Sequence, residues 1–351
     1  MSDSCPGSVS SGAAALPVLD LRELEIPERR AAFLAELGRA AREIGFFYLI
    51  GHGVPAEKFV RIEEVSRRFF ALPDEEKLAI GMANSPHFRG YTATGHELTR
   101  NRPDRREQID IGVELPALEL GPGDPVWKRL QGPNQWPAGL PALREVALDW
   151  SATLRQVAIR LLRAFAQALE QPADALDGLI DKTPAQLLKL IRYPGSSDPA
   201  LRQGVGAHKD AGILTLLHQD HHGGLQVERP EGWIDVPPIE GAFVINIGEI
   251  LELATNGYLR ATMHRVVTPP EGVVRYSIGY FLSPSLEGSV PLLPLPEHLA
   301  KLALGPESDP ENPLFREIGP NAIKGRLRSH RDVAERHYPE QYAALDRFDR
   351  R

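Results

Sequence analysis

The sequence predicts an α+β protein whose core is an antiparallel sandwich or jelly-roll barrel. Near residue 185 the spacing of apolar residues changes from helical to alternating. Several short strand-like segments then follow between residues 188 and 282, separated by turns of Gly, Pro, Asp or Asn, without a helix long enough for a parallel crossover. A long amphipathic helix before this region needs a sheet or another helix to cover its apolar face.

The chain begins with an expected leader and continues into mixed α/β structure. Residues 1–15 are rich in Ser, Gly and Ala and lack the basic start and apolar core of a secretion signal, so we expect a disordered leader. In the N-terminal region 16–115, alternating apolar residues predict a strand at 16–21. Helical spacing predicts a helix at 27–44 that stops before Gly45.

The same region continues with a strand, two helices and a polar segment. An aromatic and β-branched run predicts a strand at 46–50, and helices are expected at 56–70 and, more briefly, at 73–78. Residues 85–113 lose this periodicity and carry many His and Arg side chains, so we expect a loop. Such a loop is either solvated surface or the lining of a substrate cleft.

Residues 116–184 are expected to form a connection and a long helix. The part from 116 to 141 is rich in Gly and Pro, which indicates extended chain. Apolar residues at helical spacing then predict a helix over 143–169, which would support the sheet through its broad apolar face.

The region 185–284 is expected to form the barrel, and 285–351 to cover one end of it. After Pro284 the chain is Pro-rich and then predicted to be helical over 321–336. Strands are predicted where apolar and polar residues alternate or β-branched residues cluster. They are 188–193, 213–217, 224–228, 233–236, 242–247, 264–268 and 274–282.

Composition and charge are those of an ordinary globular protein. Of 351 residues, 25% are charged and 42% hydrophobic, and the formal net charge is -7. There is no basic run to bind nucleic acid and no apolar run to span a bilayer. The single cysteine, Cys5, excludes an intrachain disulfide and a thiolate metal site. We therefore expect a cytoplasmic protein without a nucleic-acid or membrane partner; the sequence leaves its oligomeric state open.

Two histidines and one aspartate have the spacing of a metal site. On an extended segment His208 and Asp210 share a face while Lys209 points away, and His264 begins a later predicted strand. These are the ligand types of the 2-His-1-carboxylate triad, which holds non-haem Fe(II) on one face and leaves the other positions open. Because His-x-Asp also occurs by chance as a surface pair, the interpretation depends on what accompanies it.

An anion site is predicted beside these ligands. Arg275 and Ser277 lie two residues apart on an apolar predicted strand, so their side chains share a face. A buried guanidinium is costly unless an anion meets it, and a carboxylate matches its fork. That anion is either a bound keto acid, which could also chelate the metal, or a protein carboxylate in a structural ion pair. Tyr193, near the end of another predicted strand, could add a phenolic hydrogen bond.

Together these motifs resemble the isopenicillin-N-synthase-like branch of the Fe(II)/2-oxoglutarate-dependent dioxygenases. The resemblance covers about residues 16–340, and several ordered motifs are more specific than any one of them. The segments that carry it, in the family's order, are 16–20, 45–54, 89–91, 206–220, 223–227, 246–249, 255–257, 264–267 and 275–277.

The resemblance implies a double-stranded β-helix core and a set of site residues. It also shows two departures from the family: Lys209 stands where Thr is more common, and Ile191 stands where many plant members have an Asn near the co-substrate. The implied roles are iron binding by His208, Asp210 and His264, and binding of the distal carboxylate of 2-oxoglutarate by Arg275 and Ser277, with a contribution from Tyr193.

The implied function is oxidation, above all hydroxylation, of an unactivated C–H bond in a small-molecule metabolite. Fe(II), 2-oxoglutarate and O2 would be used, succinate and CO2 released, and ascorbate is a candidate reductant. One alternative is an oxidase or oxidative cyclase of the same fold that does not use 2-oxoglutarate. The other is a non-catalytic barrel with a structural metal, although structural zinc normally has four protein ligands.

Substrate identity is not determined by the sequence. The abundance of Arg in the polar loop favours an acidic or polar metabolite. His218, His221 and His222 follow a predicted strand end and are expected in a solvated turn. The candidate substrate-lining residues, each with a surface or core alternative, are Arg89, Tyr91, Arg192 and Phe281.

Overall fold

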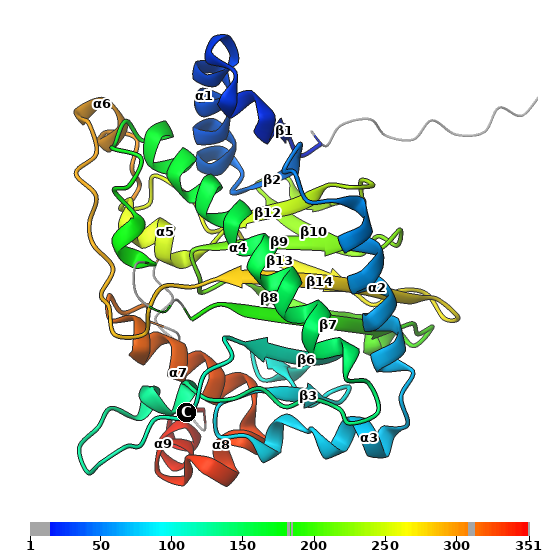
Figure 1. The fold of residues 1–351 in the computed structure, drawn as a ribbon. Coiled ribbons are helices and arrows are strands. Elements are labelled where there is room, and N and C mark those ends of the chain that lie inside the picture. Colours follow the sequence, from blue (N-terminus) through cyan, green and yellow to red (C-terminus); the bar gives the residue numbers. More distant parts are fainter. Residues whose placement is uncertain (1–14, 181–182, 184, 308–312, 350–351) are drawn as a thin grey trace, which may run out of the picture.

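Two β-sheets enclose one part of the core in the computed structural model, which describes residues 15–180, 183, 185–307 and 313–349 (Figure 1). The expected leader lies almost entirely outside these residues. In the described part, the main sheet has eight strands, antiparallel except for the pair β1 and β2. Its order is β1 (Val18–Asp20), β2 (Phe46–Ile50), β12 (Phe243–Ile247), β9 (Leu214–Gln219), β14 (Val274–Leu282), β7 (Leu187–Pro194), β6 (Glu107–Gly112) and β3 (Gly90–Thr92).

A smaller, four-stranded sheet completes the barrel. Its strands are antiparallel, and a separate two-stranded hairpin lies beside its β8 edge. The strand order is β11 (Gly232–Asp235), β10 (Leu225–Arg229), β13 (His264–Val267) and β8 (Gln203–His208), and the hairpin consists of β4 (Leu98–Thr99) and β5 (Arg102–Pro103).

The apolar interior between the two sheets confirms the predicted jelly-roll core. The predicted strands lie within two residues of the observed bounds, and inward side chains of both sheets form one buried cluster. Strands from the regions 16–115 and 185–284 share the main sheet, so these regions do not form separate layers. Members of the interior cluster include Phe46, Tyr48, Tyr193, Val205, Val227 and Val266.

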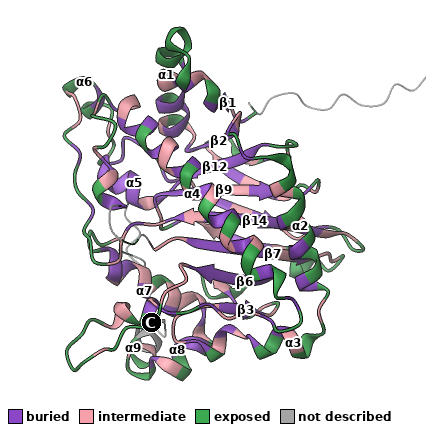
Figure 2. Cartoon of the chain, in the orientation of Figure 1, coloured by how far each residue is buried: buried purple, intermediate pink, exposed green. Residues whose placement is uncertain are grey.

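Helices cover the outer face of the main sheet (Figure 2). The long helix α4 (Ala142–Ala168) buries Trp150, Leu161 and Phe165 in the same core as Tyr280 of β14. Its amphipathic pattern predicts this burial. None of the described helices is long and apolar enough to cross a membrane. The other described α-helices are α1 (Pro27–Glu43), α2 (Ala56–Phe70), α3 (Asp74–Ala79), α5 (Glu249–Ala254), α6 (Glu297–Ala300), α7 (Ile318–Ser329), α8 (Arg331–His337) and α9 (Pro339–Asp349).

The turn from α1 into β2 requires glycine. Gly45 has φ +72°, a left-handed conformation that side chains disfavour. A Cβ there would also lie 2.3 Å from the carbonyl oxygen of Arg260. The helix thus ends where the stop signal in the sequence predicts, and the turn leads into β2, which pairs with β12.

The polar segment 85–113 contains two strands of the main sheet, so the prediction of a loop is wrong at β3 and β6. In β6, Glu107, Gln108 and Asp110 are each at most 3% exposed. The two carboxylates are neutralised inside the protein. Glu107 pairs with Lys77 and Arg192, and Asp110 pairs with Arg326 of α7. Partners from distant segments thus permit the burial of a strand whose sequence looks polar.

The C-terminal residues form three helices beside the β6–β3 edge of the main sheet (Figure 1). The predicted single helix over 321–336 is divided at His330 into α7 and α8. Apolar residues of these helices, such as Leu327 and Tyr338, pack on Phe88 and Leu130. The C-terminal segment is therefore packed on the part of the chain that carries β3.

Candidate metal and co-substrate site

The three predicted metal ligands lie together at one end of the barrel. His208 ends β8, and its antiparallel neighbour on β13 is His264. Asp210 follows two residues after His208, and its Oδ1 lies 3.5 Å from His208 Nε2 and 3.7 Å from His264 Nε2. Metal–ligand bonds of about 2.1 Å at 90–120° would put ligand atoms roughly 3.0–3.6 Å apart. The three side chains can therefore share one ion.

Backbone carbonyls fix the tautomer of both imidazoles. His208 Nδ1 lies 2.8 Å from the carbonyl oxygen of Gly206, and His264 Nδ1 lies 3.1 Å from that of Thr262. Because a carbonyl can only accept, each Nδ1 carries the hydrogen, and each Nε2 presents a lone pair to the shared space. Both rings are thus oriented for metal binding.

The carboxylate of Asp210 is held through one oxygen only. Its Oδ2 accepts hydrogen bonds from the hydroxyl of Thr215 and from Asn246 Nδ2, the latter at 2.8 Å. Its Oδ1 faces the two histidines. This division leaves one oxygen for a metal while the other fixes the orientation of the group.

The protonation states of Asp210 and His264 also suit a cation. Burial disfavours the charged form of Asp210, but His264 and His208 outweigh it and hold the pKa of the carboxyl well below its usual range. Burial and the neighbouring His208 lower the pKa of His264 to about 4. For His208, burial is outweighed by Asp210, which raises its pKa. An ionised carboxylate and a neutral imidazole are the forms that bind metals.

The predicted anion-binding residues lie on the inner face of the main sheet. Arg275 of β14 pairs with Tyr193 of β7, and Ser277 follows on the same face. Phe281, further along that face, pairs with Thr215, the residue that holds Asp210. Arg275 and Ser277 therefore face the same interior as the metal ligands.

Arg275 is buried with one nitrogen left without a partner. Its side chain is completely inaccessible, and its neutral partners are Gln219 Oε1 at 2.8 Å and the carbonyl oxygen of His222 at 3.3 Å. Its Nη1 has no hydrogen-bond partner. The guanidinium lies 4.8 Å from the centre of the Tyr193 ring, whose hydroxyl is 3.4 Å from Ser277 Oγ. The unpartnered guanidinium nitrogen and the hydroxyls of Ser277 and Tyr193 therefore lie close together, and all three can donate hydrogen bonds to a carboxylate.

The comparisons with known proteins agree with this geometry. Residues 184–284 match the model of the 2OG-Fe(II) oxygenase superfamily, and residues 16–139 match that of the N-terminal region of the non-haem dioxygenases in morphine synthesis. A 2-oxoglutarate-dependent dioxygenase of Dothideomycetidae sp. (strain 11243) is 37% identical over 94% of this chain and 94% of its own length. The chain belongs to the Fe(II)/2-oxoglutarate-dependent oxygenases.

Further relatives of this oxygenase include proteins with named substrates or ligands. The homoarginine-6-hydroxylase 2-ODD-C23.1 of Arabidopsis thaliana is 35% identical over 72% of this chain and 80% of its own. Among solved structures, a full-length Neurospora crassa protein in complex with α-ketoglutarate and thymine has a TM-score of 0.71 and 27% identity, covering 91% of this chain and 97% of that one. The predicted family, fold and cofactors are therefore confirmed.

Strand alternation corrects the substrate prediction for Tyr91 and Arg192. Since Tyr193 faces the interior of the oxygenase with Arg275, the preceding Arg192 faces outward, where it pairs with Glu107. Tyr91 donates its hydroxyl to the same carboxylate at 2.6 Å. Both residues thus lie on the helix-covered side of the main sheet, away from the triad.

The other two substrate candidates differ in position. Arg89 is partly buried, and its guanidinium donates to the carbonyl oxygens of His87 at 2.9 Å and Leu130 at 3.2 Å. Burial lowers its pKa to about 10. Phe281 is partly buried on the inner face of β14. Of the four candidates, Phe281 is therefore the one on the same strand face as Arg275, while Arg89 is held by backbone.

Three residues that orient the site were missed from the sequence. Thr215 and Asn246 hold Asp210, and Gln219 holds Arg275. The sequence contained a signal for Asn246, because it is the single polar residue of the apolar strand β12. In the structure this residue is 3% exposed. Buried polar groups in apolar strands require partners, so each marks a position to examine.

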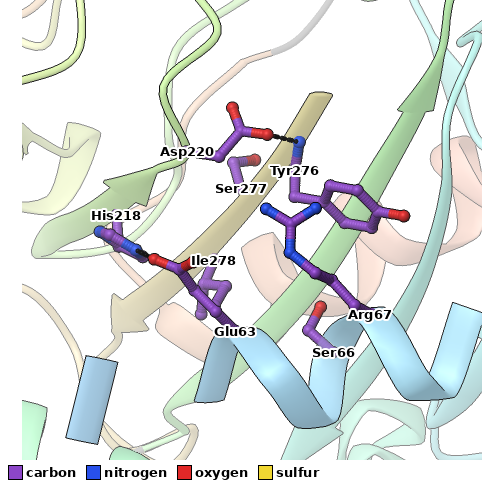
Figure 3. A pocket seen from close by; sticks show the side chains of 8 residues that line it. All are labelled: Glu63, Ser66, Arg67, His218, Asp220, Tyr276, Ser277 and Ile278. Carbon is purple, nitrogen blue, oxygen red and sulfur yellow. Dashed lines mark hydrogen bonds and ion pairs between the residues drawn. The ribbon is translucent and has the colours of Figure 1, made fainter. Parts of the chain in front are cut away.

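The structure also corrects the expected position of His218. It belongs to β9 and faces α2, in a pocket on the outer side of the main sheet (Figure 3). Its Nε2 lies 2.7 Å from Glu63 Oε1, and nearby Asp220 accepts the N–H of Tyr276 at 2.8 Å. Arg67 covers the Tyr276 ring at 4.4 Å. His218 is therefore a buried, paired side chain rather than a solvated turn residue.

A second group of possible metal ligands, Asp220, His221 and His222, lies at the turn after β9. The carboxylate of Asp220 already accepts hydrogen bonds from the backbone N–H and the Nδ1 of His222, at 2.9 and 3.1 Å. The carbonyl oxygen of His222 in turn accepts from Arg275 Nε. These contacts stabilise a turn that holds the anion-binding arginine.

Proposed function

We propose that His208, Asp210 and His264 bind the ferrous ion of this oxygenase. The two Nε2 atoms and one carboxylate oxygen that converge are the ligand set of the facial triad. Their remaining atoms are held by protein groups, so the ligands are oriented before a metal binds. This convergence is the observation that supports the proposal most strongly.

Arg275, Ser277 and Tyr193 are proposed to bind the distal carboxylate of 2-oxoglutarate. The buried Nη1 of Arg275 without a partner is the group that this anion would satisfy. The alternative from the sequence, an ion pair with a protein carboxylate, has no support in the described contacts, because the partners of Arg275 are an amide and a carbonyl. The co-substrate would extend from this anchor toward the triad.

The reaction proposed is hydroxylation of a C–H bond in a small molecule. When iron is bound, it supplies the activation of O2, coupled to decarboxylation of 2-oxoglutarate to succinate and CO2. The chain itself anchors the co-substrate at Arg275, orients the ligands through Thr215 and Asn246, and excludes water with the apolar interior of the barrel. The named relatives, a homoarginine hydroxylase and a structure with bound thymine, support a small-molecule substrate.

Succinate release without added substrate tests this proposal. We expect slow succinate formation that requires both Fe(II) and 2-oxoglutarate, and a loss of at least a hundredfold in His208→Ala. The matched control is His298→Ala, because His298 is exposed on α6 and pairs only with Glu170. Equal rates in the two variants would contradict the metal assignment. Substrate oxidation without 2-oxoglutarate would support the oxidase alternative.

A further inference from the structure

A wall of buried charged and polar side chains lies beside the triad, on the inner face of the β6–β7 end of the main sheet. Gln108 pairs with Ile191 and Asp110 with Lys189, and Ile191 pairs in turn with Ser277, so these side chains share the face of the co-substrate residues. We refer to the following residues as the polar wall: Glu97, Arg106, Gln108, Asp110, Lys189 and His330, of which His330 comes from the boundary of α7 and α8.

The polar wall adjoins the metal ligands directly. Asp104 accepts the backbone N–H of Gly206 at 3.0 Å, and the carbonyl of Gly206 holds His208 Nδ1. Arg106 lies 3.3 Å from Asp104, so the polar wall reaches the metal ligands through Asp104 and Gly206. A substrate beside the triad would therefore lie within reach of Arg106 and its neighbours.

The charges of the polar wall are balanced within the protein. Glu97 lies 3.0 Å from Lys189 and 2.9 Å from Arg106. Asp110 lies 2.7 Å from Arg326, and Asp104 shares Arg106 with Glu97. Three carboxylates thus face three cations. Among the residues of the polar wall and their described partners, a buried ligand with a net charge would find no counter-ion, at a large desolvation cost.

Four side chains of the polar wall nevertheless have a polar atom without a hydrogen-bond partner. One is Glu97 Oε2, whose charge is balanced by Arg106 at 2.9 Å. The other three are Gln108 Oε1, Arg106 Nε and His330 Nε2, in residues that are 1%, 8% and 1% exposed. Gln108 uses its amide nitrogen on Asp110 at 2.6 Å, so its oxygen remains as an acceptor. Native proteins rarely leave such atoms unpaired, and a cluster of them next to a reaction site is typical of ligand recognition.

The contacts of the neighbouring Ser329 indicate which ring nitrogen of His330 donates a hydrogen bond and which accepts one. The serine hydroxyl donates its single hydrogen to the carbonyl of Gly325 at 3.0 Å, so its oxygen accepts from His330 Nδ1 at 2.8 Å. The Nε2 is then an acceptor. It lies 3.9 Å from Glu97 Oε1, too far for a hydrogen bond, so Glu97 does not satisfy it.

We propose that the polar wall recognises the substrate, and that this substrate has no net charge and offers at least two hydrogen-bond donors and one acceptor, as a primary amide or a ureide does. The donors would meet Gln108 Oε1 and His330 Nε2, and the acceptor would meet Arg106 Nε. This inference rests on the proposed function, because it places the substrate beside the triad. It narrows the expectation of an acidic or polar metabolite to a polar, uncharged one, since Arg106 is paired with Glu97 and Asp104.

Binding to the zinc-loaded protein with 2-oxoglutarate tests this inference without turnover. Thymine and allantoin serve as neutral probes, homoarginine as a cation and indole-3-acetate as an anion, with dissociation constants from calorimetry. We expect at least one neutral probe to bind tenfold more tightly than both charged probes. Tighter binding of either charged probe, or binding of no neutral probe, would overturn the inference.

Two variants connect the affinity to the polar wall. Gln108→Met and His330→Phe should each weaken the neutral probe about tenfold, whereas Gln226→Met, on the outer surface of β10, should not. Unchanged affinity in both wall variants would overturn the assignment. The affinity for 2-oxoglutarate, measured in the same samples, separates this test from the proposed function: normal co-substrate binding with no neutral ligand would refute the substrate class alone.

Discussion

Replacement of Arg275 by lysine tests the co-substrate anchor. The side chain is inaccessible to solvent, and its Nη1 is the one guanidinium nitrogen without a protein partner. A lysine keeps the positive charge but has no planar fork, so it cannot reach Gln219, His222 and a carboxylate at once. One charge-assisted hydrogen bond to the co-substrate is worth about 2–3 kcal/mol, which corresponds to a roughly 30- to 150-fold weaker dissociation constant.

Calorimetric titration of 2-oxoglutarate into the zinc-loaded protein measures this effect directly. The matched control is Arg265→Lys: this arginine is adjacent to the metal ligand His264 but points outward, where it stacks on Trp233 at 4.1 Å. We expect wild-type affinity and an unchanged thermal midpoint in the control. A dissociation constant for Arg275→Lys within threefold of wild type would refute the assigned anchor.

Three further outcomes follow from the contacts. Asn246→Ala should weaken metal affinity about tenfold while leaving 2-oxoglutarate affinity unchanged, since the amide holds only Asp210; a metal titration with no change would contradict this. Glu107→Gln should cost about 3 kcal/mol of unfolding free energy in urea, because the buried Lys77 and the partly buried Arg192 lose their carboxylate; a cost below 1 kcal/mol would count against it. Burial lowers the pKa of His330 to about 4, below its unfolded value of 6.5, so stability is lost as pH falls from 6.5 toward 4. Between pH 7 and pH 5 wild type should lose about 2 kcal/mol more than His330→Gln, and parallel pH profiles would disprove this.

Local sequence patterns predicted the helices and strands in which buried residues recur at a regular helical or alternating spacing. The α2 bounds and the β14 bounds match the expected ones, because each has an uninterrupted apolar face that depends only on neighbours within the same segment. The pattern failed at β6, where charges alternate with isoleucines. There the partners that make burial possible come from α3, β7 and α7, which are far away in the sequence.

The sequence alone determined which residue types converge. His208 and Asp210 share a face because alternation along an extended chain is local, and the same reasoning links Arg275 with Ser277. That these two pairs face one another depends on the register of β8, β13 and β14, which the tertiary structure decides.

Tertiary structure also decided which polar residues reach the site. Arg192 and Tyr193 are adjacent in the chain, yet only Tyr193 faces the interior, because one step along a strand reverses the side-chain direction. Asn246 lies 36 positions from Asp210 and is brought to it by the pairing of β12 with β9. Strand register is set by burial summed over the whole sheet, and no short segment of sequence contains that information.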